Sequence, residues 1–379
     1  MPNVIDLFAG AGGLSLGAAR AGFNVAAAVE LDSHAMATHI NNFPLTTHIP
    51  MDILTLDADH LLDLSNISQN NLTGIIGGPP CQGFSNIGQG NVNDSRNQLF
   101  IKFFKLVNEL RPIFFLAENV PGILNDKYSA IRKEAFSYVH DYHLLPPLKI
   151  NASDYGAPTT RTRIFFIGYR SCNQILDLCE KDFLEAKVHP SQKTLVYQAL
   201  EGLPANIHYS AKSNGLKKLL PEYCDPNSNH LQSEHFYQHV IGLQPYGIGN
   251  QTYINLYQKR HIVNGCFPTK HSAKVRTRYS KLAYGQQDTI SKSPKLNPYG
   301  FCPTLRAGTG PDKGSFQAVR PIHYAYPRVI TPREAARLQG FPDWYQLPDT
   351  IWHSFRQLGN SVSPIVAEKI LTVIFQKLT

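Results

Sequence analysis

Short apolar runs alternate with helix-length segments along the first 170 residues of the chain. The runs that predict strands cover residues 4–8, 23–29, 74–76, 113–117 and 162–167. Strands bounded by turns and separated by helix-length segments are typical of a mostly parallel sheet with helices on both faces. One intervening segment, residues 14–21, is followed by Gly22 at the position expected of a helix C-cap. The pattern therefore predicts an α/β fold.

The pattern changes between residues 181 and 300, where Pro, Asn, Tyr, His and Lys replace the regular alternation. This stretch holds 15 Lys and Arg against 7 Asp and Glu, whereas the remainder holds 21 of each, so the formal charge of +8 arises here. Its 13 aromatic residues are interleaved with bases, as in Lys274 to Tyr279. Such a composition is typical of a nucleic-acid surface, although an ordinary solvated charged face would look the same.

Beyond residue 300 the helical pattern returns. Thr331, Pro332 and Glu334 are predicted to form a helix start, with a cap, a first-turn proline and a capping-box acid. The 379 residues, 42% of them hydrophobic, are enough for one large domain and a smaller one. The N-terminus has no signal-peptide pattern, and no run of 18 uncharged apolar residues occurs, so we expect a soluble cytoplasmic protein.

Six cysteines are scattered through the chain without a C-x-x-C pair, so neither a zinc site nor a disulfide framework is expected. Cys81 stands apart from the others because it follows Pro79 and Pro80 and precedes Gly83 in the segment GGPPCQGFS. A cysteine is ordinarily a small buried hydrophobe, and we expect that role of the other five. The two prolines stiffen the chain before Cys81, and the glycine after it allows a mobile loop, so Cys81 could instead be a reactive thiol.

The first predicted strand leads through DLFAGAGG into a helix, with glycines where the backbone must turn sharply and let a ligand approach the helix N-terminus. The next strand ends near Glu30, 18 residues after Gly12, where a carboxylate could accept hydrogen bonds from ribose hydroxyls. The spacing does not match G-x-G-x-x-G, and no Walker A lysine follows. A dinucleotide site and an ATP site are therefore both disfavoured.

Six blocks, in this order, resemble the C5-cytosine-specific DNA methyltransferase family of the bacterial restriction-modification type. They are DLFAGAGG, PPCQGFS, ENV, TTRTR, RPIHYAYPRVITPREAARLQGFP and GNSVSPIVAEKI. The resemblance implies a Rossmann-like, S-adenosylmethionine-dependent methyltransferase sheet with a second, smaller DNA-recognition domain. It assigns residues 1–172 and 353–379 to a catalytic, cofactor-binding domain, and residues 173–352 to a target-recognition domain and hinge. The variable recognition region would span about 181–300, which lacks family motifs.

The resemblance also implies the chemistry of a DNA (cytosine-5-)-methyltransferase. Cys81 matches the thiolate that adds to C6 of the cytosine, and Glu118 matches the acid at N3 of the base. Arg163 matches the arginine that contacts O2 of the base, and Arg161 supports the same loop. In one departure, Thr159 replaces the glutamine of the family's Gln-x-Arg-x-Arg, which leaves the contacts of that glutamine in doubt.

The cofactor implied is S-adenosylmethionine, with S-adenosylhomocysteine as product and no metal. Ten residues match the family's cofactor site: Phe8, Gly10 and Gly12 in the cradle, Glu30 at the ribose, Asp52 and Ile53 at the adenine, Asn360 and Ser361 at the methionine end, and Pro80 and Leu99 as further cofactor-binding residues. For Asp52, an exposed turn acid is an equally good interpretation.

The partner implied is double-stranded DNA, with the target base extruded from the stack. In the loop after Cys81, Ser85, Gln89 and Arg96 are candidates for phosphate contacts or for filling the vacated stack. The candidates outside this loop are Lys259, Arg260, Lys274, Arg276, Arg278 and Arg306. For any single one of them, a non-specific phosphate contact or a solvated charge is favoured over base reading.

We expect a monomer on DNA, a bacterial or phage enzyme that protects host DNA from a cognate restriction endonuclease, and a cytoplasmic location at the nucleoid. Two alternatives stay open at this point. One is the tRNA-methylating branch of the same fold, which the 120-residue basic stretch disfavours. The other is a catalytically silent DNA-binding relative, which the presence of Cys81, Glu118 and Arg163 disfavours.

Overall fold

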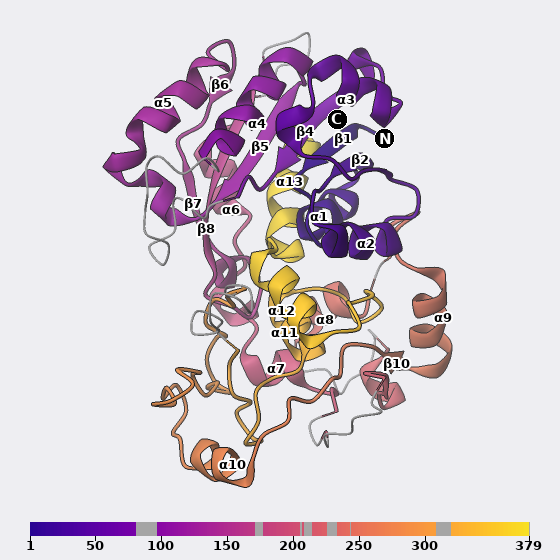
Figure 1. The fold of residues 1–379 in the computed structure, drawn as a ribbon, viewed down its shortest axis with the longest axis vertical. Coiled ribbons are helices and arrows are strands. Elements are labelled where there is room, and N and C mark those ends of the chain that lie inside the picture. The colour runs from indigo at the N-terminus through magenta and orange to yellow at the C-terminus, as the bar shows by residue number, and fades with distance from the viewer. Residues whose placement is uncertain are drawn as a thin grey trace.

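The computed structural model describes residues 1–80, 97–170, 177–204, 207, 214–225, 233–242, 244–307 and 320–378. An α/β body built on one sheet forms the upper part of the molecule in Figure 1, and a body of short helices and loops forms the lower part. The C-terminal helices α11 to α13 run from the lower body up to the sheet. The strands are β1 (Asn3–Leu7), β2 (Asn24–Val29), β3 (Thr47–Ile49), β4 (Leu72–Gly77), β5 (Phe114–Asn119), β6 (His143–Leu144), β7 (Leu148–Asn151), β8 (Thr162–Tyr169), β9 (Lys217–Lys218) and β10 (Ile262–Val263).

Within the described residues the main sheet has the order β3-β2-β1-β4-β5-β8-β6, and β7 also pairs with β8. The first five strands in this order, β3, β2, β1, β4 and β5, pair in parallel, as expected from the sequence. The remaining pairings are antiparallel, because β8 runs opposite to β5, β6 and β7. The α/β fold with a central sheet is therefore confirmed, and its parallel part is limited to the half that carries the glycine-rich turn. A separate small sheet pairs β9 with β10.

Helices cover both faces of the main sheet, because its strands alternate their apolar side chains between two cores. Phe114 and Leu116 of β5 belong to one buried cluster, and Phe115 and Ala117 belong to the other. The first face is covered by α1 and α13, and the second by α3, α4 and α5. The helices are α1 (Gly13–Ala21), α2 (Ser33–Asn42), α3 (Ala58–Ser65), α4 (Asn97–Leu110), α5 (Ser129–Ser137), α6 (Glu180–Glu185), α7 (Val196–Leu200), α8 (Glu234–Val240), α9 (Gln251–Arg260), α10 (Ala273–Ser280), α11 (Pro332–Gln339), α12 (Ile351–Asn360) and α13 (Pro364–Leu378).

Helix α13 packs closely against α1, at the opposite end of the chain. A side chain at Gly17 of α1 would collide with Ala367 of α13, so the two helices meet backbone to backbone. The segment Ile351–Leu378 is long and apolar enough to cross a membrane by length and composition alone. It consists of two helices, α12 and α13, and 67% of its most apolar window is buried within the structure. These helices therefore form part of the protein core.

The lower body and the α/β body share one buried core. One buried cluster contains Leu14 of α1 and Phe236 and Trp344 of the lower body. The domain boundaries at residues 172 and 353 stay a prediction.

Helix α11 begins as expected from the sequence, with Thr331 as N-cap and Glu334 completing a capping box.

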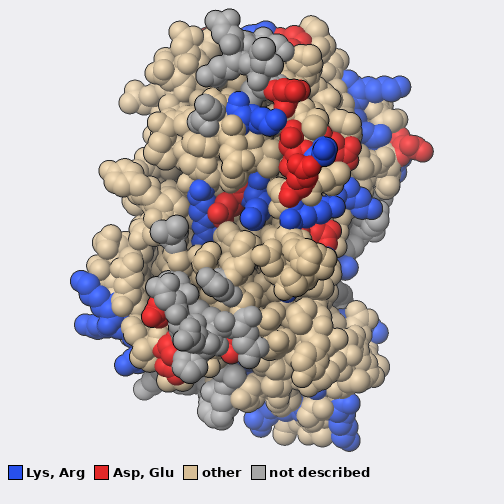
Figure 2. Space-filling model, turned by 180° about the vertical axis from the view of Figure 1, so that it is seen from behind, with Lys and Arg blue, Asp and Glu red and all other residues tan. Residues whose placement is uncertain are grey.

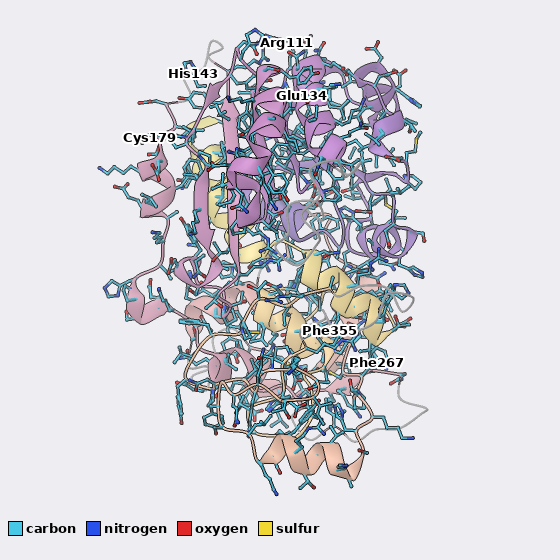
Figure 3. The ribbon with its side chains drawn as sticks, turned by 60° about the vertical axis from the view of Figure 1, so that its left-hand side comes forward. Arg111, Glu134, His143, Cys179, Phe267 and Phe355 are labelled. Atoms are coloured by element: carbon cyan, nitrogen blue, oxygen red, sulfur yellow. The ribbon has the colours of Figure 1, made fainter. Side chains whose placement is uncertain are left out.

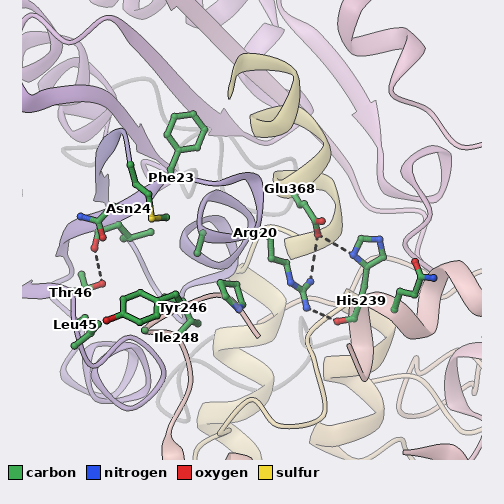
Figure 4. Close-up of a pocket in the computed structure, with 15 residues that line it drawn as sticks. Arg20, Phe23, Asn24, Leu45, Thr46, His239, Tyr246, Ile248 and Glu368 are labelled. Atoms are coloured by element: carbon green, nitrogen blue, oxygen red, sulfur yellow. Dashed lines mark hydrogen bonds and ion pairs between the residues drawn. The ribbon is translucent and has the colours of Figure 1, made fainter. Parts of the chain in front are cut away.

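A second contact between the bodies lies beside a cavity of about 390 Å³ at the end of α1 (Figure 4). Arg20 of α1 donates to the carbonyl of His239 in α8, and the His239 ring pairs with Glu368 of α13 at 3.0 Å. Glu368 also faces Arg20 at 3.7 Å. Burial raises the pKa of Glu368, but hydrogen bonding and charge from His239, together with Arg20, hold it below its usual value. This charge cluster links α1, α8 and α13.

Candidate active site

A cavity of about 660 Å³ opens at the carboxyl ends of β1, β2, β4 and β5 and is closed on one side by α12. Ligands bind in open parallel sheets at this edge because the loops leaving the strands meet there. Nine of the ten predicted cofactor residues line the cavity: Phe8, Gly10, Glu30, Asp52, Ile53, Pro80, Leu99, Asn360 and Ser361. Glu118, Arg161 and Arg163 line it as well. The structure thus brings together residues from eight separate segments of the sequence.

The turn between β1 and α1 is shaped by backbone conformations that few residues adopt. Gly10 and Gly12 have φ of 56° and 78°, and Phe8 has φ of 65° although it is not glycine. Glu30 fixes this turn from the end of β2, because its carboxylate accepts from the Gly10 N–H at 2.9 Å and the Asp32 N–H at 2.7 Å. Burial raises the pKa of Glu30.

Gly12 is the predicted cofactor residue that does not line the cavity. It caps α1, and a Cβ at this position would collide with the ring of Phe43 and lie 2.9 Å from the Tyr345 hydroxyl. Tyr345 in turn donates to the carbonyl of Ala11. Gly12 therefore shapes the turn from behind by letting two aromatic side chains pack against it.

We expect Gly12→Ala to weaken S-adenosylmethionine binding by at least about tenfold and to lower the unfolding temperature. The reason is that the added methyl group must displace Phe43 or Tyr345, and Ala is strained at a φ of 78°. Isothermal titration calorimetry and thermal unfolding would measure the two effects. Gly285→Ala is the matched control, because Gly285 also has a positive φ of 76° but has nothing within 4 Å of its Cβ position. Wild-type affinity in Gly12→Ala would contradict this interpretation.

Glu118 and Arg163 form a buried pair at the cavity wall. Glu118 lies near the end of β5 and Arg163 near the start of β8, which pairs antiparallel with β5. The Arg163 Nε lies 2.7 Å from Glu118 Oε1, and the two side chains are only 15% and 10% exposed. The Arg163 Nη1 donates to the Thr162 carbonyl, which fixes the guanidinium. The arrangement leaves a carboxyl group held at the cavity by an arginine.

Arg161 has a different role from Arg163, since it connects three segments of the chain. Its Nη1 donates to the carbonyls of Leu305, at 3.3 Å, and Gly359, at 2.9 Å. Thr159, which stands where the family has glutamine, is 1% exposed, and its hydroxyl donates to the Cys302 carbonyl at 2.9 Å. These contacts tie the loop before β8 to the segment before residue 307 and to α12.

Several cavity residues were missed by the sequence reasoning. Asp32 pairs with Arg356 of α12 at 2.8 Å, and Gln357 donates to the carbonyl of His34. The rings of His353 and His34 lie 3.6 Å apart. The spacing of three to four residues that puts His353, Arg356 and Asn360 on one helix face was a usable signal. The buried Asp6 also lines the cavity, and no signal beyond its place in DLFAGAGG pointed to it.

The predicted DNA contacts outside the loop after Cys81 divide into exposed and paired side chains. Lys259 and Arg260 end α9, Lys274 and Arg276 lie on α10, and all four are exposed, as is Arg306. Figure 2 shows Lys and Arg side chains at the lower end of the molecule, where Figure 1 places α10.

Arg278 differs from these, because it is half-buried and its guanidinium binds both oxygens of Asp288, at 2.5 and 3.1 Å. The structure thus gives Arg278 an intramolecular partner, whereas the five exposed cations named above have access to solvent. Cys81, Ser85, Gln89 and Arg96 lie outside the described residues.

The four cysteines that the structure describes are free thiols, and three of them fit the expected buried or half-buried role. Cys266 and Cys302 are buried, and Cys224 is half-buried. Burial raises the pKa of Cys266 to about 12 and that of Cys224 to about 11, which makes both poor nucleophiles. The expectation was wrong for Cys179, which is exposed at the start of α6 (Figure 3). Cys172 lies outside the described residues. Across the described part of the chain, no group of three or more His, Cys, Asp and Glu side chains is placed to hold a metal ion.

Comparison with known proteins extends over the whole length of the chain. The model of the family "C-5 cytosine-specific DNA methylase" matches residues 2–376. The type II methyltransferase M.XorII of Xanthomonas oryzae pv. oryzae is 36% identical over 97% of this chain and 83% of its own length. M.DdeI of Desulfomicrobium norvegicum is 32% identical over 97% of this chain and 87% of its own length.

Solved structures agree with these sequence relatives. A crystal structure from E. coli, described as a DNA modification methyltransferase encoded within a prophage, is 47% identical, with a TM-score of 0.86 over 100% of this chain and 99% of that chain. S. pombe Dnmt2, at 15% identity and a TM-score of 0.65, covers 100% of this chain and 99% of its own and shares the fold. The chain therefore belongs to the C-5 cytosine-specific DNA methylase family and is a DNA cytosine-5-methyltransferase.

Proposed function

We propose that this enzyme transfers a methyl group from S-adenosylmethionine to C5 of a flipped-out cytosine in a specific double-stranded DNA sequence. The observation that carries the proposal is the single cavity in which the glycine-rich turn, Glu30 and the Glu118–Arg163 pair meet. In this proposal, the cofactor enters the cavity from the side of the turn between β1 and α1, and the base enters it from the side of Glu118. The names of the type II relatives support DNA as the substrate.

The residues of the cavity fit S-adenosylmethionine. Gly10 leaves room for a ligand at the turn, because a Cβ there would meet nothing nearer than a backbone oxygen at 4.0 Å. The Glu30 carboxylate lies at the end of β2, where ribose hydroxyls can donate to its remaining lone pairs. Asp52 and Ile53 would bound the adenine, and Asn360 and Ser361 would close the methionine end. When bound, S-adenosylmethionine supplies an electrophilic methyl group.

In the proposed reaction, the Cys81 thiolate adds to C6 of the cytosine and makes C5 nucleophilic. Glu118 hydrogen-bonds N3 and stabilises the charge that develops on the ring during this addition. Arg163 positions Glu118 through their 2.7 Å contact and supplies N–H donors for O2 of the base. After methylation, loss of the C5 proton to a base expels Cys81 and restores the aromatic ring. Extrusion of the cytosine costs a few kcal/mol, which contacts to the DNA must offset.

Sequence recognition is assigned to the basic residues between 181 and 300, in a recognition domain of about residues 173–352. Exposed Lys259, Arg260, Lys274 and Arg276 would supply salt-dependent affinity for phosphates. Arg278 would instead maintain local structure through Asp288. We further infer that the enzyme acts in the cytoplasm, as a monomer on DNA, and protects host DNA from a cognate restriction endonuclease.

Base-resolution 5-methylcytosine mapping in cells that express the protein tests the proposal, with Cys81→Ala as the comparison. We expect methylation at one short motif with the wild type and none with the variant. A duplex that carries 5-fluorocytosine at this motif should trap the wild type covalently, because fluorine cannot leave C5 as a proton does. Soluble, folded wild-type protein that methylates no DNA, but methylates tRNA or binds DNA without reaction, would contradict it.

A further inference from the structure

A chain of buried polar side chains runs from the cavity across the first face of the sheet. Asp6 lies in β1, lines the cavity and is 1% exposed. Its Oδ2 is hydrogen-bonded to Ser15 of α1, and Ser15 Oγ lies 3.0 Å from Nε2 of His39 in α2. The other ring nitrogen of His39 lies 2.9 Å from Nε2 of the half-exposed His48 in β3. Four side chains from four elements thus form one hydrogen-bonded row.

The far end of the row is His48, whose Nε2 faces His39. A neutral imidazole that accepts a hydrogen bond at Nε2 carries its own proton on Nδ1, and a cationic imidazole carries a proton on each nitrogen.

The row can hold its protons in two arrangements in which every hydrogen bond between its members has one donor and one acceptor. In the neutral arrangement, Asp6 is a protonated acid that donates to Ser15, and Ser15 donates to Nε2 of His39. His39 then donates from Nδ1 to Nε2 of His48. In the charged arrangement every one of these bonds is reversed, Asp6 is a carboxylate, and His48 is a cation protonated on both nitrogens.

The two arrangements are related by the shift of one proton along each of three hydrogen bonds. Asp6 gives its proton to Ser15, Ser15 passes its own to His39, and His39 passes the proton on Nδ1 to His48. Ser15 and His39 are neutral before and after, and the total charge of the row does not change. The shift moves a negative charge to the cavity wall and a positive charge to the partly exposed edge of the sheet.

Burial favours the neutral arrangement when no cation lies in the cavity. It raises the pKa of Asp6 to about 7, although hydrogen bonding from Ser15 lowers that pKa, and nearby Glu30 adds a smaller rise. It also lowers the pKa of both His39 and His48. Tyr345 is the further titratable group near Asp6; burial and Asp6 raise its pKa well above its usual value, so it stays neutral.

The Oδ1 atom of Asp6 is buried and has no hydrogen-bond partner among the described residues. A buried carboxyl oxygen without a donor is costly when it carries charge, and a cation nearby removes that cost. S-adenosylmethionine carries a sulfonium charge that S-adenosylhomocysteine lacks. Both ligands carry the ammonium group of the methionine portion, so a carboxylate of Asp6 that forms only against the sulfonium would favour the substrate form of the cofactor over the product form.

We propose that Asp6, Ser15, His39 and His48 are a proton relay that makes Asp6 anionic when a cationic ligand fills the cavity, and so favours S-adenosylmethionine over S-adenosylhomocysteine. In this role Asp6 faces the cationic group of the ligand, and Ser15, His39 and His48 are positioning residues, because they act only through Asp6. The inference rests on the proposed cofactor, whose binding must be present for the relay to be observed.

Asp6→Asn tests the relay, because Asn keeps the shape of the protonated acid but cannot ionise. We expect the variant to bind S-adenosylmethionine about tenfold more weakly, relative to S-adenosylhomocysteine, than the wild type does, as measured by calorimetry with each ligand. Retained binding of S-adenosylhomocysteine shows that the variant folds. An equal change in both affinities, or no change in either, would overturn the relay. A wild type that binds neither ligand would instead overturn the cofactor assignment.

Nitrogen-15 NMR of His48 provides a second measurement that does not depend on a variant. His48 should be a cation in the complex with S-adenosylmethionine and neutral with S-adenosylhomocysteine at the same pH. Ser15→Ala interrupts the row and should abolish this difference, whereas His140→Gln, at an exposed position elsewhere, should preserve it. The same His48 charge in both wild-type complexes would refute the relay.

Discussion

Replacing Glu118 with Gln is expected to lower kcat by roughly 10²- to 10⁴-fold, the range over which a positioned acid or base accelerates a reaction. Gln keeps the size of the side chain but removes the charge that pairs with Arg163 at 2.7 Å. It can also no longer share or donate an acidic proton at N3 of the base. Addition of Cys81 to C6 would then proceed without stabilisation of the charge on the ring.

Single-turnover methylation of a cognate duplex measures the chemical step, and calorimetry with S-adenosylmethionine measures binding separately. We expect the affinity for the cofactor to change little, because the proposed function assigns Glu118 to the base and not to the cofactor. Glu134→Gln in α5 is a matched control, since Glu134 is exposed and does not line the cavity. A kcat for Glu118→Gln within threefold of the wild type would refute the assigned role.

The largest effect on stability is expected for Arg337→Met, which should lower the free energy of unfolding by about 3–5 kcal/mol. Arg337 and Asp343 are both completely buried, and the guanidinium donates to the carboxylate from Nε at 2.9 Å and from Nη2 at 2.5 Å. Its Nη1 donates to the Glu201 carbonyl at 2.5 Å. Met would fill much of the space but leave the Asp343 charge buried without its partner.

Urea unfolding followed by circular dichroism would measure the loss. The double variant Arg337→Met, Asp343→Leu should recover much of it, because no unpaired charge then remains in the core. Lys181→Met, which removes an exposed pair with Glu185 in α6, should change the stability little. A loss below 1 kcal/mol for Arg337→Met would show that the core solvates or neutralises Asp343 in another way.

The parallel half of the sheet and its cavity were predictable because local sequence determines them. Phe8, Glu30 and Glu118 come at or just after the ends of apolar strands, and parallel strands that end at one edge bring such residues together. The cap at Gly22 and the capping box at Thr331 depend on a few adjacent residues, and both were predicted correctly.

The features that escaped prediction depend on residues distant in the chain. The direction of β8 is set by how the chain returns to β5. Strands β6 and β7 are too short to show a periodic pattern of hydrophobic positions. Thr159 bonds to Cys302, 143 positions later, and no local pattern could reveal that contact. The exposure of Cys179 likewise follows from the placement of α6 on the surface rather than from its own neighbours.

The close packing of α13 on α1 also bears on how the enzyme is made. Translation at about 5–20 residues per second separates the appearance of α1 from that of α13 by roughly 20–70 s. Throughout this interval the apolar face of α1 has no α13 to cover it, and Asn360 and Ser361 are not yet present at the cavity wall. The nascent chain must therefore be kept from aggregating, and it acquires the complete cofactor cavity only at the end of synthesis.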